Sequence, residues 1–97
     1  MEKRLRLNLL YDYYKDFFTE KQQSYFEDYY YSNYSLGEIA LENKVSRNAI
    51  HNQLKIVEDR LEEMESILKL VDKKEKILNL LKDKVDKKIL EEIDDIL

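Results

Sequence analysis

A group of side chains suited to reading nucleic acid lies between residues 46 and 55 of the sequence. Arginine can donate two hydrogen bonds to guanine, asparagine can pair with the edge of adenine, and alanine can contact the methyl group of thymine. Serine and a helix N-terminus suit phosphate groups. On a helix these residues share the outward face, and the candidate binding residues are Ser46, Arg47, Asn48, Ala49, His51, Asn52 and Lys55.

Two capped helices in close succession would position these residues. Ser35 and Glu38 fit a capping box, which predicts a helix over residues 36–42. Residues 43–44 then make a turn, and Ser46 caps the next helix. A helix-turn-helix motif also needs a small residue in its first helix, an apolar residue in the turn and inward apolar residues on its second helix. These positions are filled by Ala40 after Ile39, by Val45, and by Ile50 and Leu54.

Helical periodicity covers the rest of the chain. Apolar residues at helical spacing, Phe17 and Phe18 among them, predict a first helix over residues 3–18. A capping box at Thr19 starts a second one, which ends near residues 31–33 and carries an aromatic stripe. A long helix runs from Arg47 to about Val71, followed by short helices over 72–85 and from the cap Asp86 onward. With one glycine and no proline for tight turns, the sequence predicts an all-α fold.

An apolar seam follows the long helix. Its residues are Val57, Leu61, Met64, Leu68 and Val71, spaced by four and three in turn. A helix of roughly 35 Å is too long to be buried wholly within so small a domain. The seam must therefore pack on the helices after Asp72, on a second copy of the chain, or on both. A homodimer is the favoured prediction because it doubles the phosphate contacts and suits a symmetric site one turn long. The alternative is a monomer whose tail helices cover the seam.

Composition excludes several classes of protein. Ninety-seven residues make one domain, and zero cysteines with one histidine leave no metal site and no redox chemistry. No pocket signature accompanies the many carboxylates, so we expect no enzyme, no cofactor and no small-molecule substrate. No stretch is long and apolar enough for a membrane span, and no leader is visible, which predicts a cytoplasmic protein. Residues 1–57 hold eight cations and eight acids, whereas residues 58–97 hold nine and thirteen, so the acidity lies in the second half.

The chain resembles the YlxM family of small bacterial proteins over about residues 3–70, and its helix-turn-helix is similar to region 4 of sigma factors. The resemblance implies a DNA-binding or regulatory protein linked to the signal recognition particle pathway. Asn48 stands where the family commonly has glutamine, so the base preference does not carry over. The matching elements are Tyr29-Tyr30-Tyr31, Ser35-Leu36-Gly37-Glu38-Ile39-Ala40 and Val45-Ser46-Arg47-Asn48-Ala49-Ile50.

These observations predict an all-α fold of the winged-helix or sigma region 4 kind. This fold would consist of a three- to four-helix core with a long C-terminal helix, followed by one or two short tail helices. Residues 1–71 would form the core with its extended recognition helix, and residues 72–97 a helical tail that packs on the core or on a dimer partner. Three functions stay open: a DNA-binding regulator, a non-catalytic partner of the signal recognition particle RNA or GTPase, and a helical interaction module.

Overall fold

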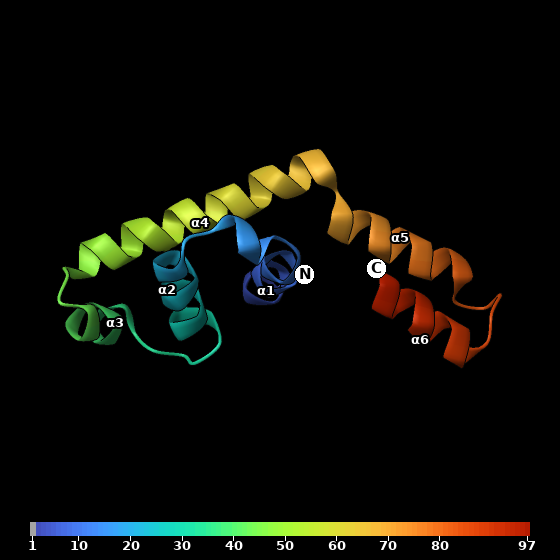
Figure 1. Ribbon diagram of the computed structural model, residues 1–97, viewed down its shortest axis with the longest axis horizontal. Helices are drawn as coiled ribbons and strands as arrows, with labels where there is room; N and C mark the ends of the chain where they lie inside the picture. Colours follow the sequence, from blue (N-terminus) through green and yellow to red (C-terminus); the bar gives the residue numbers. More distant parts are fainter. Residues whose placement is uncertain (1) are drawn as a thin grey trace.

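The computed structural model describes residues 2–97, and every regular element in that range is helical. Figure 1 shows α1, α2 and α3 gathered along one side of the long helix α4, with α5 and α6 side by side beyond its C-terminal end. The all-α prediction is therefore confirmed. The elements are α1 Lys3–Tyr14, the 3-10 turn η1 Lys15–Phe17, α2 Glu20–Tyr30, α3 Leu36–Asn43, α4 Arg47–Leu68, α5 Leu70–Leu81 and α6 Lys87–Ile96.

The helix starts agree with the capping signals of the sequence. Thr19 and Ser35 each form a complete capping box with the residue three positions on, and Ser46 and Asp86 each accept from the third backbone N–H of their helix. The first helix is shorter than expected, because the α-helix gives way at Lys15 to a 3-10 turn. The changed rotation leaves Phe17 72% exposed, so its predicted inward position is wrong.

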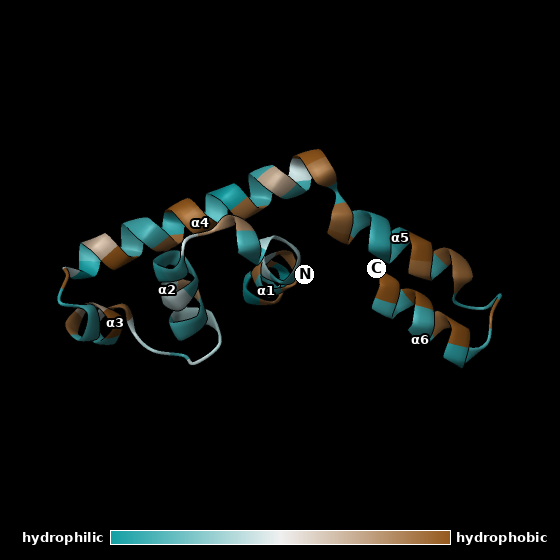
Figure 2. Ribbon diagram, viewed as in Figure 1, coloured by the Kyte–Doolittle hydropathy of each residue, from teal (hydrophilic) through white to brown (hydrophobic). Residues whose placement is uncertain are grey.

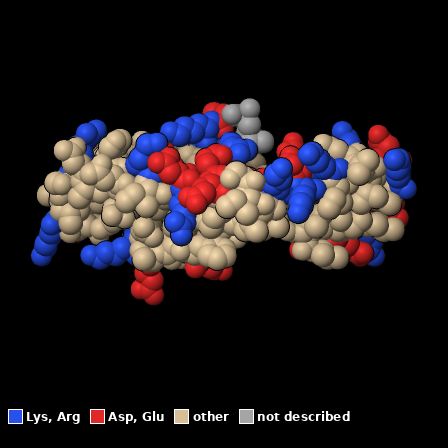
Figure 3. All heavy atoms as spheres, turned by 90° about the horizontal axis from the view of Figure 1, so that it is seen from above, with Lys and Arg blue, Asp and Glu red and all other residues tan. Residues whose placement is uncertain are grey.

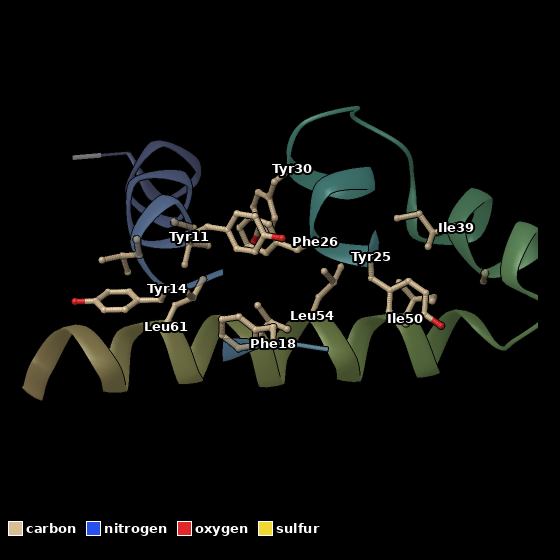
Figure 4. Packing of buried hydrophobic residues seen from close by; sticks show 14 residues of the cluster. Tyr11, Tyr14, Phe18, Tyr25, Phe26, Tyr30, Ile39, Ile50, Leu54 and Leu61 are labelled. Carbon is tan, nitrogen blue, oxygen red and sulfur yellow. The ribbon is translucent and has the colours of Figure 1, made fainter. Parts of the chain in front are cut away.

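The core lies where α1, α2 and α3 meet α4 (Figure 4). Tyr11 stacks on Phe26 with ring centroids 4.2 Å apart, and Phe26 in turn packs on Tyr30. Aromatic rings supply large buried area, so a domain this small obtains a core without a sheet. The buried hydrophobic residues are Leu7, Leu10, Tyr11, Tyr14, Phe18, Tyr25, Phe26, Tyr30, Ile39, Ala40, Ile50, Leu54, Val57 and Leu61.

Three buried tyrosine hydroxyls donate hydrogen bonds to glutamates at the edge of this core. Their O–O distances are 2.6 to 2.7 Å, which is the usual length of a charge-assisted bond between a hydroxyl and a carboxylate. Each bond lets a large ring be buried while its hydroxyl keeps a partner. The pairs are Tyr11 with Glu27, Tyr14 with Glu65, and Tyr30 with Glu58.

The seam of α4 is covered inside one chain by α1 and α2, a cover that the sequence argument did not include. Val57 and Leu61 are fully buried, and Met64 and Val71 pack partly buried against the core. Leu68, in contrast, is 43% exposed and adds little to this packing. The buried part of the seam is therefore not available to a second copy of the chain.

The long helix ends earlier than predicted, at Leu68 rather than near Val71. Lys69 adopts the left-handed conformation with φ 56°, and α5 begins directly after it. The carboxylate of Glu65, only 6% exposed, accepts from the backbone N–H groups of Val71 and Asp72 at 3.1 and 3.0 Å. A side chain of α4 thus caps α5. The predicted helix cap at Asp72 is wrong, because the N-cap is Lys69 and α5 begins at Leu70.

Contacts with α1 hold the tail. The Lys74 ammonium forms an ion pair with Asp94 at 2.9 Å and lies 5.6 Å from the centroid of the Tyr13 ring. The Tyr13 hydroxyl donates to the backbone oxygen of Leu97 at 2.6 Å. The antiparallel pair α5–α6, called the tail hairpin below, lies beyond the C-terminal end of α4 and does not fold back over it. The longest dimension is 53 Å.

Candidate nucleic-acid interface

Helices α3 and α4 form a tight helix-turn-helix. Lys44 takes the left-handed conformation with φ 57°, and its backbone N–H donates to the carbonyls of Ala40 and Leu41. The N–H of Val45 donates to Ala40 at 3.1 Å, which completes a helix-ending turn that usually carries glycine. The positive φ falls on Lys44, whereas Asn43 ends the helix and its amide donates to the carbonyl of Ile39.

The packing inside the motif follows the predicted pattern. Ile39 and Ala40 of α3 are 0% and 5% exposed, and Ile50 and Leu54 of α4 are 0% and 3% exposed. Because Ala40 has a single methyl group, the two helices can cross closely. Val45 is 38% exposed, so the apolar residue of the turn is only partly covered.

The outward side of α4 is open over its first three turns. Ser46, Arg47, Asn48, His51, Asn52 and Lys55 are all exposed, and Ala49 is half-buried. Within residues 2–97, the side chains of Arg47, Asn48, His51 and Asn52 make no hydrogen bond or ion pair. The hydrogen-bond donors of these four side chains are therefore free for a ligand. The seven residues from Ser46 to Lys55 named above are called the reading face below.

Two members of the reading face have partners inside their own helix. The Ser46 hydroxyl accepts from the backbone N–H of Ala49 at 3.0 Å, so it serves as the helix cap and can still donate its hydrogen to a phosphate. The Lys55 ammonium forms an ion pair with Asp59 at 2.9 Å, and this bond raises the pKa of Lys55. Both groups are exposed, so a nucleic-acid phosphate can compete with Asp59 at little cost.

Acidic residues follow the reading face directly on its C-terminal side. No Asp or Glu occurs from Ser46 to Lys55, whereas Glu58, Asp59 and Glu62 follow within the next two turns. The Arg6 guanidinium binds the Glu62 carboxylate through two bonds of 2.8 and 2.9 Å, which lowers the pKa of Glu62. Figure 3 shows acidic side chains gathered over the middle of the molecule. A polyanion is therefore favoured only at the first three turns of α4.

The structure adds residues that sequence reasoning did not find. A shallow groove on one side of the reading face is lined by Lys21 and Gln53 beside Ala49. A second groove on the other side is lined by Lys3, His51 and Lys55. Lys3 and Lys21 lie far from α4 in the sequence, and only the packing of α1 and α2 on α4 brings them near, so no local signal could have revealed them.

Other kinds of site have no support in the described part of the chain. Among residues 2–97, no group of three or more His, Cys, Asp or Glu side chains has the geometry to hold a metal ion. No helix of that range is long and apolar enough to cross a membrane. The arrangement that does stand out is an open, weakly cationic helix face with free bidentate donors.

The fold and this face define a protein of the helix-turn-helix class. Comparison with known protein families agrees: residues 1–96 match the model of the UPF0122 family, described as "Putative helix-turn-helix protein, YlxM / p13 like". The chain belongs to this family, which confirms the resemblance found in its sequence.

Relatives from several bacteria cover most of the chain. It is 46% identical over 95 residues to the UPF0122 protein BH2485 of Halalkalibacterium halodurans, which covers 95% of this chain and 87% of the relative. It is 47% identical over 88 residues to a UPF0122 protein of Geobacillus, covering 88% and 80%. A UPF0122 protein of Listeria monocytogenes is 43% identical over 90 residues, covering 90% and 82%.

Proposed function

We propose that this chain is a cytoplasmic, non-catalytic regulator that binds duplex DNA through the reading face of α4. The observation that carries the proposal is the open face itself. Arg47, Asn48, His51 and Asn52 have unused donors in a helix that the motif presents outward. An α-helix fits the major groove, where these donors can meet base edges.

Phosphate contacts support the same placement. Lys21 lies in the groove on one side of the reading face, and Lys3 lies in the groove on the other side. Lys44 is exposed in the turn before α4. A helix inserted into the major groove has a phosphate backbone on each side, so cations on both sides fix its depth and orientation without reading sequence.

The experiment compares Arg47→Ala with a matched control. Arg47→Ala removes a free bidentate donor and should weaken binding to duplex DNA by roughly tenfold or more, without loss of thermal stability. Lys73→Ala removes the same charge from an exposed position of α5 and should leave the affinity unchanged. Fluorescence anisotropy with a randomised duplex pool, followed by selection of the tightest sequences, gives both affinity and preference.

The same titration includes the signal recognition particle RNA and GTPase, because the family resemblance links the chain to that pathway. Binding to either of them with no measurable binding to any duplex would contradict the proposal and favour a docking module. Equal affinity of the parent and Arg47→Ala for every duplex, at several salt concentrations, would show that the reading face is not the contact surface.

A further inference from the structure

The tail hairpin carries apolar surface that one chain does not cover. Twelve of residues 70–97 are Leu, Ile or Val, yet none of the residues in that range is buried. Leu80 of α5 is 66% exposed, and Ile89 and Ile96 of α6 are 43% and 83% exposed. Hydrophobic turns run through both helices in Figure 2. Two helices alone cannot enclose a core, whereas four can.

The charges of α6 oppose its own dipole. After the cap Asp86, its first turn holds Lys87 and Lys88 and no acid, and its last turn holds Asp94 and Asp95 and no base. Cations at a helix N-terminus and acids at its C-terminus both destabilise an isolated helix. Residues 82–88 carry four lysines and two aspartates, a net +2, and residues 91–95 carry four acids and no base, a net −4.

This pattern is self-complementary. When two copies of α6 lie antiparallel about a twofold axis, the basic end of each meets the acidic end of the other. The register that places Ile89 opposite the partner's Ile96 also brings Lys88 close to the partner's Asp95. Neither Lys88 nor Asp95 has an ion pair among residues 2–97, whereas Asp94 is occupied by Lys74.

From these observations we infer that the tail hairpin binds a second copy of this chain through antiparallel α6 helices and forms a four-helix bundle. The apolar stripe supplies the affinity, and the charge pattern selects the antiparallel orientation. The hairpin is about 20 Å wide and 15 to 18 Å long, a face smaller than a standard interface, so we expect a dissociation constant in the micromolar range. The inference is independent of the proposed DNA binding.

Sedimentation equilibrium of the full chain, from roughly 1 to 100 μM, tests the pairing. The parent should approach twice the chain mass of 11.8 kDa at the upper end. Lys88→Glu and Asp95→Lys each turn two symmetric attractions into repulsions and should each raise the dissociation constant about tenfold. The double variant K88E/D95K swaps the charges and should return to within about threefold of the parent.

Two further variants complete the test. Ile96→Glu places a charge in the apolar stripe and should leave only monomer. Lys21→Glu makes the same charge change as Lys88→Glu, at an exposed position of α2, and should not alter the mass. Far-ultraviolet circular dichroism confirms that each variant keeps its helix content. A parent that stays monomeric at the highest concentration, a K88E/D95K variant that stays as weak as the single ones, or an equal effect of Lys21→Glu would overturn the inference.

Discussion

Glu65 connects three helices through one buried carboxylate. It accepts from the Tyr14 hydroxyl of α1 and from two backbone N–H groups of α5, while its own backbone belongs to α4. Since a buried donor without a partner costs about 1 to 3 kcal/mol, this residue sets where α4 ends and α5 begins. In the sequence it is one glutamate among many, and nothing local distinguishes it from its exposed neighbours Glu62 and Glu63.

Tyr14 is one of three buried tyrosines that give the protein an alkaline limit of stability. Burial, helped by the hydrogen bond to Glu65, raises the pKa of Tyr14 to about 12. The folded pKa therefore lies above the unfolded value of about 10, so the stability from this group is full below pH ~10 and is lost as the pH rises through 12. Burial raises the pKa of Tyr11 and Tyr30 as well.

Tyr14→Phe should lower the free energy of unfolding at neutral pH by about 1 to 2 kcal/mol, because Glu65 loses a donor. The same variant should show a smaller loss of stability between pH 9 and 12 than the parent, measured as the urea midpoint at each pH. A parent and a variant with parallel pH profiles would mean that another tyrosine controls the alkaline transition.

At the scale of elements, the sequence predicts helix starts better than helix ends. Thr19, Ser35, Ser46 and Asp86 each start a helix through a bond to a backbone N–H three residues on, a signal that is complete within four residues. The ends at Lys15 and Lys69 depend on tertiary contacts, and neither carries glycine or proline as a marker.

The residues of the candidate site also differ in how far the sequence could predict them. The seven residues of the reading face follow from helix periodicity within one motif, and the structure leaves six of them exposed. Lys3 and Lys21 belong to the same surface only through the packing of three helices. Sequence reasoning could not find them because charged residues near helix starts are common.

Ala40→Leu tests the close crossing of α3 and α4. Ala40 is 5% exposed, and three extra carbons must push the two helices apart, at a cost of about 1 to 3 kcal/mol. The thermal midpoint should fall accordingly. Leu41→Ala is the matched control, because Leu41 is 82% exposed on the same helix and its loss should change the midpoint little. Equal midpoints for Ala40→Leu and the parent would contradict the close crossing.

At the scale of the whole molecule, the weak charge of the candidate interface is expected to limit its affinity for duplex DNA. The cations near the reading face are few, and the acids of α4 follow directly after it. If three to five phosphates are neutralised, the logarithm of affinity should fall with the logarithm of salt concentration with a slope of roughly −3 to −5. Anisotropy titrations at four salt concentrations measure it, and a slope near zero would exclude phosphate contacts.

The elongated shape places the reading face and the tail hairpin far apart. The start of α4 and the helix α6 lie at opposite ends of the molecule in Figure 1. A pair joined at α6 would therefore hold its reading faces further apart than the ~34 Å of one DNA turn. The symmetric site one turn long expected from the sequence does not suit this pair, and half-sites spaced by more turns do.

The placement of the aromatic residues has an optical consequence. All eight tyrosines and three phenylalanines lie between residues 11 and 34, and the chain has no tryptophan. Near-ultraviolet circular dichroism and tyrosine emission therefore report on α1, α2 and the loop after α2, whereas α5 and α6 contribute only to the far-ultraviolet bands. A loss of far-ultraviolet signal without a matching near-ultraviolet change would therefore report, without any label, melting outside the aromatic core.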